Sequence, residues 1–228
     1  MKKIGVPFLI VNPKSYLYGE ESLKLAKAAD KAAEETGVEV MFTCPFADLR
    51  YIKENTKHVV VTAQHMDSLK PGRGMGHVLG ESLVAAGAEA VFLNHAENSM
   101  TVADLAATMK RAKELGIATV VCADSVAEGV AIAELGPDIL LCEPTDLIGT
   151  GTVADDSYVL EACTRIRKVD ENILVMIASG VSTPEDVYNV IKLGADGTGA
   201  TSGILNAPNP GERVMEMAKA MKKAIAER

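Results

Sequence analysis

Eight short apolar runs recur along the chain, separated by longer segments of mixed polarity. Most of these runs are rich in Val, Ile and Leu without alternation, which is typical of strands buried on both faces. The last run, GTGA, has the weakest apolar pattern. We predict strands at residues 7–11, 38–43, 59–63, 90–93, 118–122, 139–142, 174–178 and 197–200.

The intervening segments place apolar residues at helical spacing. Glycine follows the last periodic residue of several of them, as it commonly does at helix ends. Ser182 and Thr183 precede Pro184, which gives a capping residue followed by proline at the first helical position. We predict helices at residues 20–36, 101–115, 125–135, 157–169, 184–193 and 210–226, with shorter ones at 46–53 and 79–86 and a short one starting near residue 203.

Strands that alternate with helices predict parallel βαβ units. Eight such units in 228 residues leave each one close to the minimum length of roughly 30 residues. We therefore predict an α/β fold, a (β/α)8 barrel formed by residues 1–228 as a single domain. A doubly wound open sheet is the alternative. The first strand, however, lacks a G-x-G-x-x-G turn, and polar residues gather at nearly every strand end.

Charge and composition restrict the class of partner. The formal net charge is -8, and no basic stretch offsets it, so we expect no nucleic-acid binding. No segment approaches the roughly 20 apolar residues of a membrane span, and the N-terminal apolar run is too short for a signal peptide. An anionic ligand would have to be held locally, by backbone N–H groups and a lysine.

The four cysteines show neither CxxC spacing nor a Cys/His metal pattern. We expect them to be reduced and largely buried, which suits a cytoplasmic protein. We expect no metal and no cofactor.

In a parallel barrel, chemistry is located at the C-terminal ends of the strands. Taken singly, a strand-end lysine, histidine or glutamate is ordinarily a solvated, structural or helix-capping residue. Here several such groups and three Gly/Ser/Thr-rich loops converge. The strand-end residues are Asn12, Lys14, Gln64, His65, Asn94, His95, Glu97, Glu143, Ile148, Gly149, Ser179, Gly180, Thr201 and Ser202.

One carboxylate, one imidazole and one lysine match a single kind of chemistry. Proton abstraction beside a carbonyl needs a base, and a carboxylate serves once desolvation raises its pKa. An imidazole can donate to the oxygens of a hydroxycarbonyl, and a lysine stabilises the developing negative charge. Loop N–H groups after the last strands can bind a phosphate.

Several motifs make a family resemblance specific. Asn12-Pro13-Lys14 resembles the N-x-K of triosephosphate isomerases. The segment LNHAEN at 93–98 is similar to the archaeal-type L-N-H-S-E-N, and Glu143-Pro144 with IGTG at 148–151 is similar to E-P-x-x-x-I-G-T-G. The segments at 63–67 and 191–203 resemble the third strand and the final phosphate loop. The resemblance runs from about residue 8 to the end.

The resemblance implies a TIM barrel that interconverts glyceraldehyde 3-phosphate and dihydroxyacetone phosphate in glycolysis and gluconeogenesis. By the same resemblance, Glu143 is the general base, His95 the neutral electrophile, and Lys14 the residue that stabilises the enediolate. The residues implied to position Lys14 or to lie beside it are Asn12, Gln64 and Glu97. Those implied to hold the substrate phosphate are Ile148, Gly149, Gly180, Thr201 and Ser202, with residues 144–152 as a closing lid.

Some positions depart from the family pattern. Ala96 replaces a serine, Ala178 adds a methyl group where the archaeal-type enzymes have glycine, and Cys142 stands where many members have tyrosine. The segment 199–202 also lacks the bulkier apolar residues that usually precede the phosphate loop. These changes leave two alternatives: an aldose–ketose isomerase of a larger sugar phosphate, such as a tetrose phosphate, or a non-catalytic phosphate-binding barrel. The second would need no base.

Residues 65–82 form a long connection for a βα unit, and long loops are usually functional or interfacial. This segment resembles the inter-subunit loop of the family. The resemblance implies a homo-oligomer, at least a dimer, with the tetramer of archaeal-type members favoured.

Overall fold

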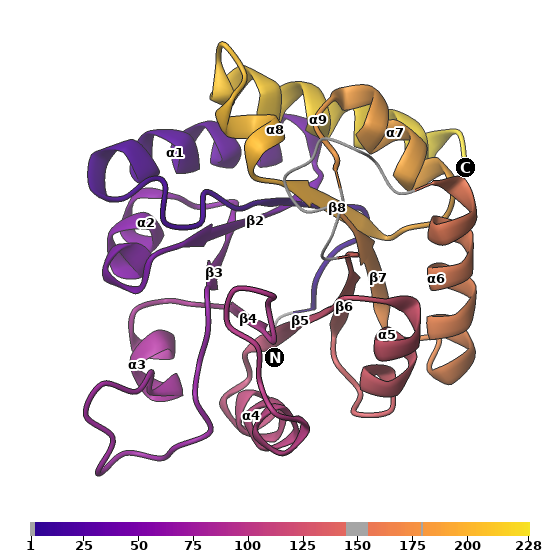
Figure 1. The fold of residues 1–228 in the computed structure, drawn as a ribbon. Helices are drawn as coiled ribbons and strands as arrows, with labels where there is room; N and C mark the ends of the chain where they lie inside the picture. Colours follow the sequence, from indigo (N-terminus) through magenta and orange to yellow (C-terminus); the bar gives the residue numbers. More distant parts are fainter. Residues whose placement is uncertain (1–2, 145–154, 179) are drawn as a thin grey trace.

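The computed structural model describes residues 3–144, 155–178 and 180–228. Its strands are parallel and close into a barrel in the order β1 to β8, which confirms the predicted (β/α)8 fold and excludes the open sheet. Figure 1 shows the strands at the centre, with the helices around them. The strands are β1 Phe8–Val11, β2 Glu39–Cys44, β3 Val60–Ala63, β4 Ala90–Leu93, β5 Ala118–Ala123, β6 Ile139–Cys142, β7 Leu174–Ile177 and β8 Gly197–Ala200.

Every predicted helix is present within a few residues of its expected bounds. A 3-10 turn at Phe46–Asp48 precedes the second helix, so the predicted 46–53 segment begins in a tighter conformation. The helices are α1 Gly19–Thr36, α2 Leu49–Asn55, α3 Gly80–Ala85, α4 Val102–Leu115, α5 Val126–Ala133, α6 Asp156–Val169, α7 Pro184–Lys192, α8 Ser202–Leu205 and α9 Pro210–Ala226. Among the described residues, no helix is both long and apolar enough to span a membrane.

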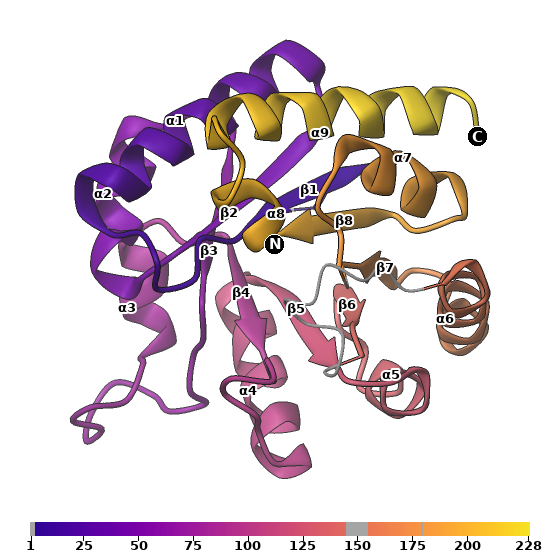
Figure 2. The same cartoon turned by 45° about the horizontal axis from the view of Figure 1, so that its top comes forward.

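Two apolar layers hold the barrel. The larger one lies between the strands and the helices, and the smaller one fills the barrel interior with side chains such as Phe8, Ile10, Met41 and Phe92. Helix α9 packs against both α1 and α7, and Figure 2 shows it running across them. All four cysteines are free and buried, as expected.

The packing of β8 against β1 explains the weak apolar pattern of the last strand. A Cβ atom added to Gly197 would lie 2.3 Å from the ring of Phe8, and one added to Gly199 would lie 2.6 Å from the carbonyl oxygen of Ile10. Large side chains on β1 occupy the space that β8 leaves open. The last strand, β8, is therefore poor in apolar side chains because side chains of its neighbour β1 already fill this part of the barrel interior.

The connection between β3 and α3 reaches away from the barrel (Figure 2). Asp67 closes its base, since its carboxylate accepts a hydrogen bond from the Val78 backbone at 2.6 Å and a bridge links Asp67 to Leu79. His65 and His77 lie within 3.5 Å of the same carboxylate. The apolar side chain of Met75, near the tip, is fully exposed.

Candidate active site

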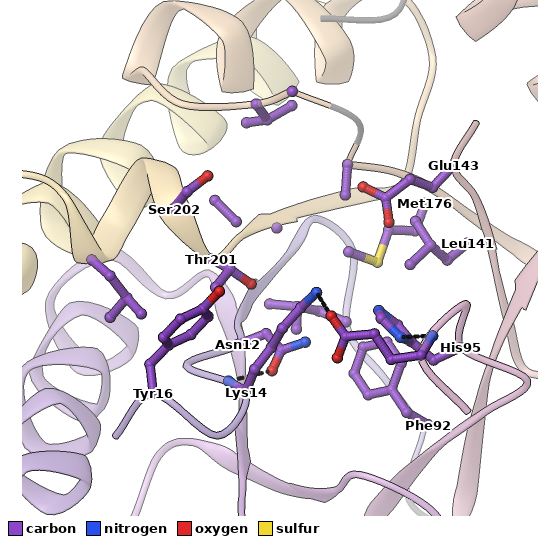
Figure 3. A pocket seen from close by; sticks show the side chains of 18 of the residues that line it. Asn12, Lys14, Tyr16, Phe92, His95, Leu141, Glu143, Met176, Thr201 and Ser202 are labelled. Atoms are coloured by element: carbon purple, nitrogen blue, oxygen red, sulfur yellow. Dashed lines mark hydrogen bonds and ion pairs between the residues drawn. The ribbon is translucent and has the colours of Figure 1, made fainter. Parts of the chain in front are cut away.

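One cavity of about 500 Å³ opens at the C-terminal ends of the strands. It collects most of the predicted site residues from five different strands, and Figure 3 shows many of their side chains around it. The predicted residues that line it are Asn12, Lys14, His95, Glu97, Glu143, Gly180, Thr201 and Ser202. Ile148, Gly149 and Ser179, and the predicted lid beyond Pro144, lie outside the described residues.

Lys14 is held in an unusual backbone conformation. Its φ of 49° lies in the left-handed region, which non-glycine residues rarely adopt. The Asn12 side chain accepts a hydrogen bond from the Lys14 N–H at 3.0 Å, and the Gln64 amide donates to the Lys14 carbonyl at 2.9 Å. Asn12 and Gln64 therefore hold the backbone N–H and the backbone carbonyl of Lys14, one each.

The ammonium group of Lys14 donates to Glu97 at 2.7 Å. The lysine side chain is only 18% exposed, whereas that of Glu97 is 65% exposed. The hydrogen bond from Lys14 lowers the pKa of the Glu97 carboxyl despite partial burial. The Lys14 ammonium group thus lies at the cavity wall, and its partner Glu97 is the more exposed to solvent.

His95 is arranged as a neutral donor. Its Nδ1 accepts a hydrogen bond from the backbone N–H of Glu97 at 3.1 Å, so in the neutral ring the proton is on Nε2. Burial lowers the pKa of His95, and the charge of Lys14 lowers it further. At neutral pH the ring therefore offers an Nε2–H group without a positive charge.

Glu143 follows β6 directly, and its backbone N–H donates to the Ala123 carbonyl at 2.9 Å. In Figure 3 its carboxylate lies beside the apolar side chains of Leu141 and Met176. Burial raises the pKa of Glu143, and the charge of Lys14 offsets part of that rise. A desolvated carboxylate is a stronger base than a hydrated one.

The opposite wall of the cavity is built from the loops after β7 and β8. Gly180 has a φ of 70°, in the left-handed region that favours glycine. The Ser182 hydroxyl donates to the Gly180 carbonyl at 3.0 Å, and a capping box between Thr183 and Asp186 begins α7. The predicted short helix is α8, which begins at Ser202.

Asn94 directly follows β4, and the sequence alone assigns no role to it. Its φ of 56° is left-handed, and its side chain accepts from the Met100 N–H at 2.9 Å. Its amide donates to the Cys122 carbonyl at 3.0 Å and to Glu128 at 3.3 Å. Asn94 thus ties the backbone beside His95 to β5 and α5. The tolerance of asparagine for left-handed φ is the signal that could have identified it.

The cavity also has a wall that the sequence did not predict. Several of its side chains are apolar or aromatic, and they come from β1, β4, β6, β7 and the segments around α1 and α8. They are Ile10, Tyr16, Leu17, Phe92, Leu141, Met176 and Leu205.

Two of the departures from the family pattern, Ala178 and Cys142, differ in whether they reach the cavity. Ala178 lines the cavity, so its methyl group is part of the wall. Cys142 does not line it, because its sulfur packs outward under α5, 2.6 Å from where a Cβ atom on Gly129 would lie. The cysteine therefore leaves the cavity shape unchanged.

A closed barrel with a desolvated carboxylate, a neutral imidazole and a lysine around one cavity defines the class of barrel isomerases that move a proton beside a carbonyl. A triosephosphate isomerase family model matches residues 7–221. The chain belongs to the triosephosphate isomerase family.

Several archaeal relatives cover nearly the whole chain. It is 35% identical to the triosephosphate isomerase of Methanocaldococcus jannaschii over 92% of this chain and 98% of the relative. It is 37% identical to the triosephosphate isomerase of Methanopyrus kandleri, over 94% of this chain and 97% of the relative. It is 33% identical to that of Sulfolobus acidocaldarius, over 97% of this chain and 98% of the relative. These matches confirm the archaeal-type resemblance and favour a triose phosphate isomerase over the two alternatives.

Proposed function

We propose that the protein interconverts glyceraldehyde 3-phosphate and dihydroxyacetone phosphate, a step of glycolysis and gluconeogenesis. The observation that carries the proposal is the meeting of Glu143, His95 and Lys14, from three strand ends, in one cavity. The raised pKa of Glu143 and the lowered pKa of His95 fit a base and a neutral donor.

In this proposal the Glu143 carboxylate removes a proton from the carbon beside the substrate carbonyl. His95 donates from Nε2 to the carbonyl oxygen as negative charge develops there, and the Lys14 ammonium stabilises the resulting enediolate. The proton then returns from Glu143 to the neighbouring carbon, and the hydroxyl proton on that carbon passes to the former carbonyl oxygen with His95 as the relay. The product is the isomer, without net gain or loss of atoms or electrons.

The substrate phosphate is proposed to lie on the opposite wall, against Gly180, Thr201 and Ser202. Ile148 and Gly149 belong to the same proposal through the family resemblance. Backbone N–H groups in such loops bind a dianion without positive side chains, which suits a chain with a net charge of -8. No metal or cofactor is needed for this chemistry.

The direct test is a coupled assay of the purified chain with glyceraldehyde 3-phosphate and, in parallel, with erythrose 4-phosphate. We expect turnover of the triose phosphate at a kcat/KM at least about 10²-fold above that of the tetrose phosphate, because an added carbon must fit the wall at Ala178. Equal or better turnover of the tetrose phosphate would contradict the triose phosphate assignment and identify the larger sugar phosphate as the substrate.

We also propose that residues 1–228 act as one catalytic domain, in the cytoplasm and as a homo-oligomer, with a tetramer favoured. The free, buried cysteines suit a reducing compartment. The fully exposed Met75 on a loop that leaves the barrel supports a contact with a second copy. Light scattering after size-exclusion chromatography should give the molar mass of four chains per particle. The mass of a single chain would contradict this assignment.

A further inference from the structure

We propose that Arg213 is a positioning residue that holds the two halves of the phosphate-binding wall together. This inference rests on the proposed function for the location of the phosphate. Neither the sequence patterns nor the family motifs single out Arg213, which lies in the first turn of α9, outside the cavity.

The guanidinium of Arg213 bridges two loops that are distant in sequence. One of its terminal nitrogens donates to the Ser182 carbonyl at 2.5 Å, in the loop after β7, and to the Gly203 carbonyl at 3.2 Å, in α8 after β8. Both carbonyls lie within two residues of groups that line the cavity, namely Gly180 and Ser202. Hydrogen bonds from a charged donor are about twice as strong as neutral ones, so the bridge is a strong restraint.

The backbones of these loops are also in direct contact. A Cβ atom on Gly203 would lie 2.4 Å from the Cα of Ser182 and 2.8 Å from the Val181 carbonyl oxygen. Any side chain at Gly203 would therefore force the loops apart. The close approach and the bridge act on the same pair of loops and set their separation.

Arg213 itself is fixed at its base. Asn209 caps α9 by accepting a hydrogen bond from the Glu212 N–H, and Pro210 occupies the first turn. Gly211 packs so closely on α1 that an added Cβ atom would lie 2.8 Å from Ala28. The Arg213 side chain is 23% exposed, and its Nε lies 3.4 Å from Glu216.

A dianion bound by backbone N–H groups from two loops depends on the distance between those loops, because each hydrogen bond weakens steeply outside its narrow range. Arg213 therefore acts on phosphate affinity without touching the phosphate or the reacting carbons. The proton-transfer residues come from β1, β4 and β6 and are not linked to this bridge by any of the contacts described above.

The experiment compares Arg213→Met with Arg165→Met in the full-length chain. Arg165 is an exposed residue of α6 paired with Glu161, so its replacement removes the same charge without touching either loop. The probe is inorganic phosphate, whose dissociation constant is measured by titration without turnover. We expect about 10-fold weaker binding for Arg213→Met, because the displaced loops should weaken their contacts to the dianion by about as much as the loss of one hydrogen bond. For Arg165→Met we expect a change of less than about 2-fold.

Turnover of two substrates distinguishes a defect in phosphate binding from general destabilisation, which would lower the turnover of both. Glyceraldehyde lacks the phosphate, so kcat/KM for glyceraldehyde should stay within about 2-fold in Arg213→Met, whereas kcat/KM for glyceraldehyde 3-phosphate should fall about 10-fold. Gly203→Ala, which keeps Arg213 but separates the loops, should weaken phosphate binding at least as much. It also covers the case in which Arg213→Met fails to fold.

Wild-type phosphate affinity in both Arg213→Met and Gly203→Ala would overturn the inference while leaving the proposed function intact. An equal loss in Arg165→Met would also overturn it, since net charge alone would then explain the effect. Failure of the proposed function has a different signature: the wild-type chain would bind phosphate but convert neither triose phosphate.

Discussion

The two walls of the cavity use different chemistry. The wall formed by β1, β4 and β6 presents charged or ionisable side chains, Lys14, His95 and Glu143, with shifted pKa values at His95 and Glu143. The wall formed after β7 and β8 presents small residues and backbone. In the proposed function, the first wall stabilises charge that moves during the reaction, and the second binds a charge that is already present on the substrate. Mutations in the two walls should therefore separate turnover from anion binding.

The largest expected effect is on the first wall. Glu143→Gln keeps the shape but removes the base, so kcat should fall at least ~10³-fold, at the upper part of what a positioned base contributes. The dissociation constant for inorganic phosphate should change little. A clean preparation with near-normal turnover would refute the role of Glu143, and Glu161→Gln on the surface of α6 is the matched control.

Lys14 belongs to the first wall, and its replacement should show whether it also serves the second. We expect Lys14→Met to lower kcat/KM by ~10²- to 10³-fold, because a fixed charge in a water-poor site stabilises the transition state by several kcal/mol. Its effect on phosphate affinity should be smaller. Steady-state kinetics beside phosphate titration test this, with the exposed Lys31→Met as control. Comparable losses in both measurements would move Lys14 to the phosphate wall.

Asn94 should affect the first wall by a smaller amount. Asn94→Gly removes three hydrogen bonds but tolerates the left-handed backbone, so kcat should fall about 10-fold through misplacement of His95. Asn94→Ala should add a stability loss of about 1 kcal/mol from the strained φ. Kinetics and urea unfolding separate the two effects. Unchanged kcat in the glycine variant would show that the backbone alone positions His95.

The same contrast explains what the sequence could predict. Lys14, His95 and Glu143 were identifiable as candidates because ionisable side chains that closely follow apolar strands stand out in the sequence. The barrel was predictable because its strands are buried on both faces and therefore read as continuous apolar runs. The last strand was the weakest prediction, since its Gly197 and Gly199 are explained only by the large Phe8 and Ile10 side chains of the adjacent strand β1.

For the second wall, the Gly/Ser/Thr-rich loops after the last strands indicated phosphate binding in general, but only the family resemblance assigned it to Gly180, Thr201 and Ser202. Loops that act through backbone N–H groups leave glycine, serine and threonine in the sequence, which are also ordinary turn residues. Arg213 gave no local signal, because its proposed role depends on hydrogen bonds to the carbonyl groups of Ser182 and Gly203. The apolar cavity wall likewise includes Phe92 and Met176, which appear in the sequence as ordinary strand residues.

The smallest expected effect is thermodynamic. Burial raises the pKa of Glu143 above its ordinary value of 4.5, so the folded state holds its proton to a higher pH than the unfolded state does. Below the unfolded pKa both states are protonated, and the favourable contribution of the neutral carboxyl is fully present. As the pH rises through the folded pKa, the folded protein must ionise a buried group and that contribution is lost.

Glu143→Gln should therefore be more stable than wild type by roughly 0.5–2 kcal/mol at pH 8, and the difference should shrink as the pH falls towards 4.5. Urea unfolding at several pH values measures it, and Ser202→Ala on the opposite wall, whose hydroxyl does not titrate, should give a pH-independent difference. A stability gain for Glu143→Gln that did not vary with pH would show that the buried charge is not its cause.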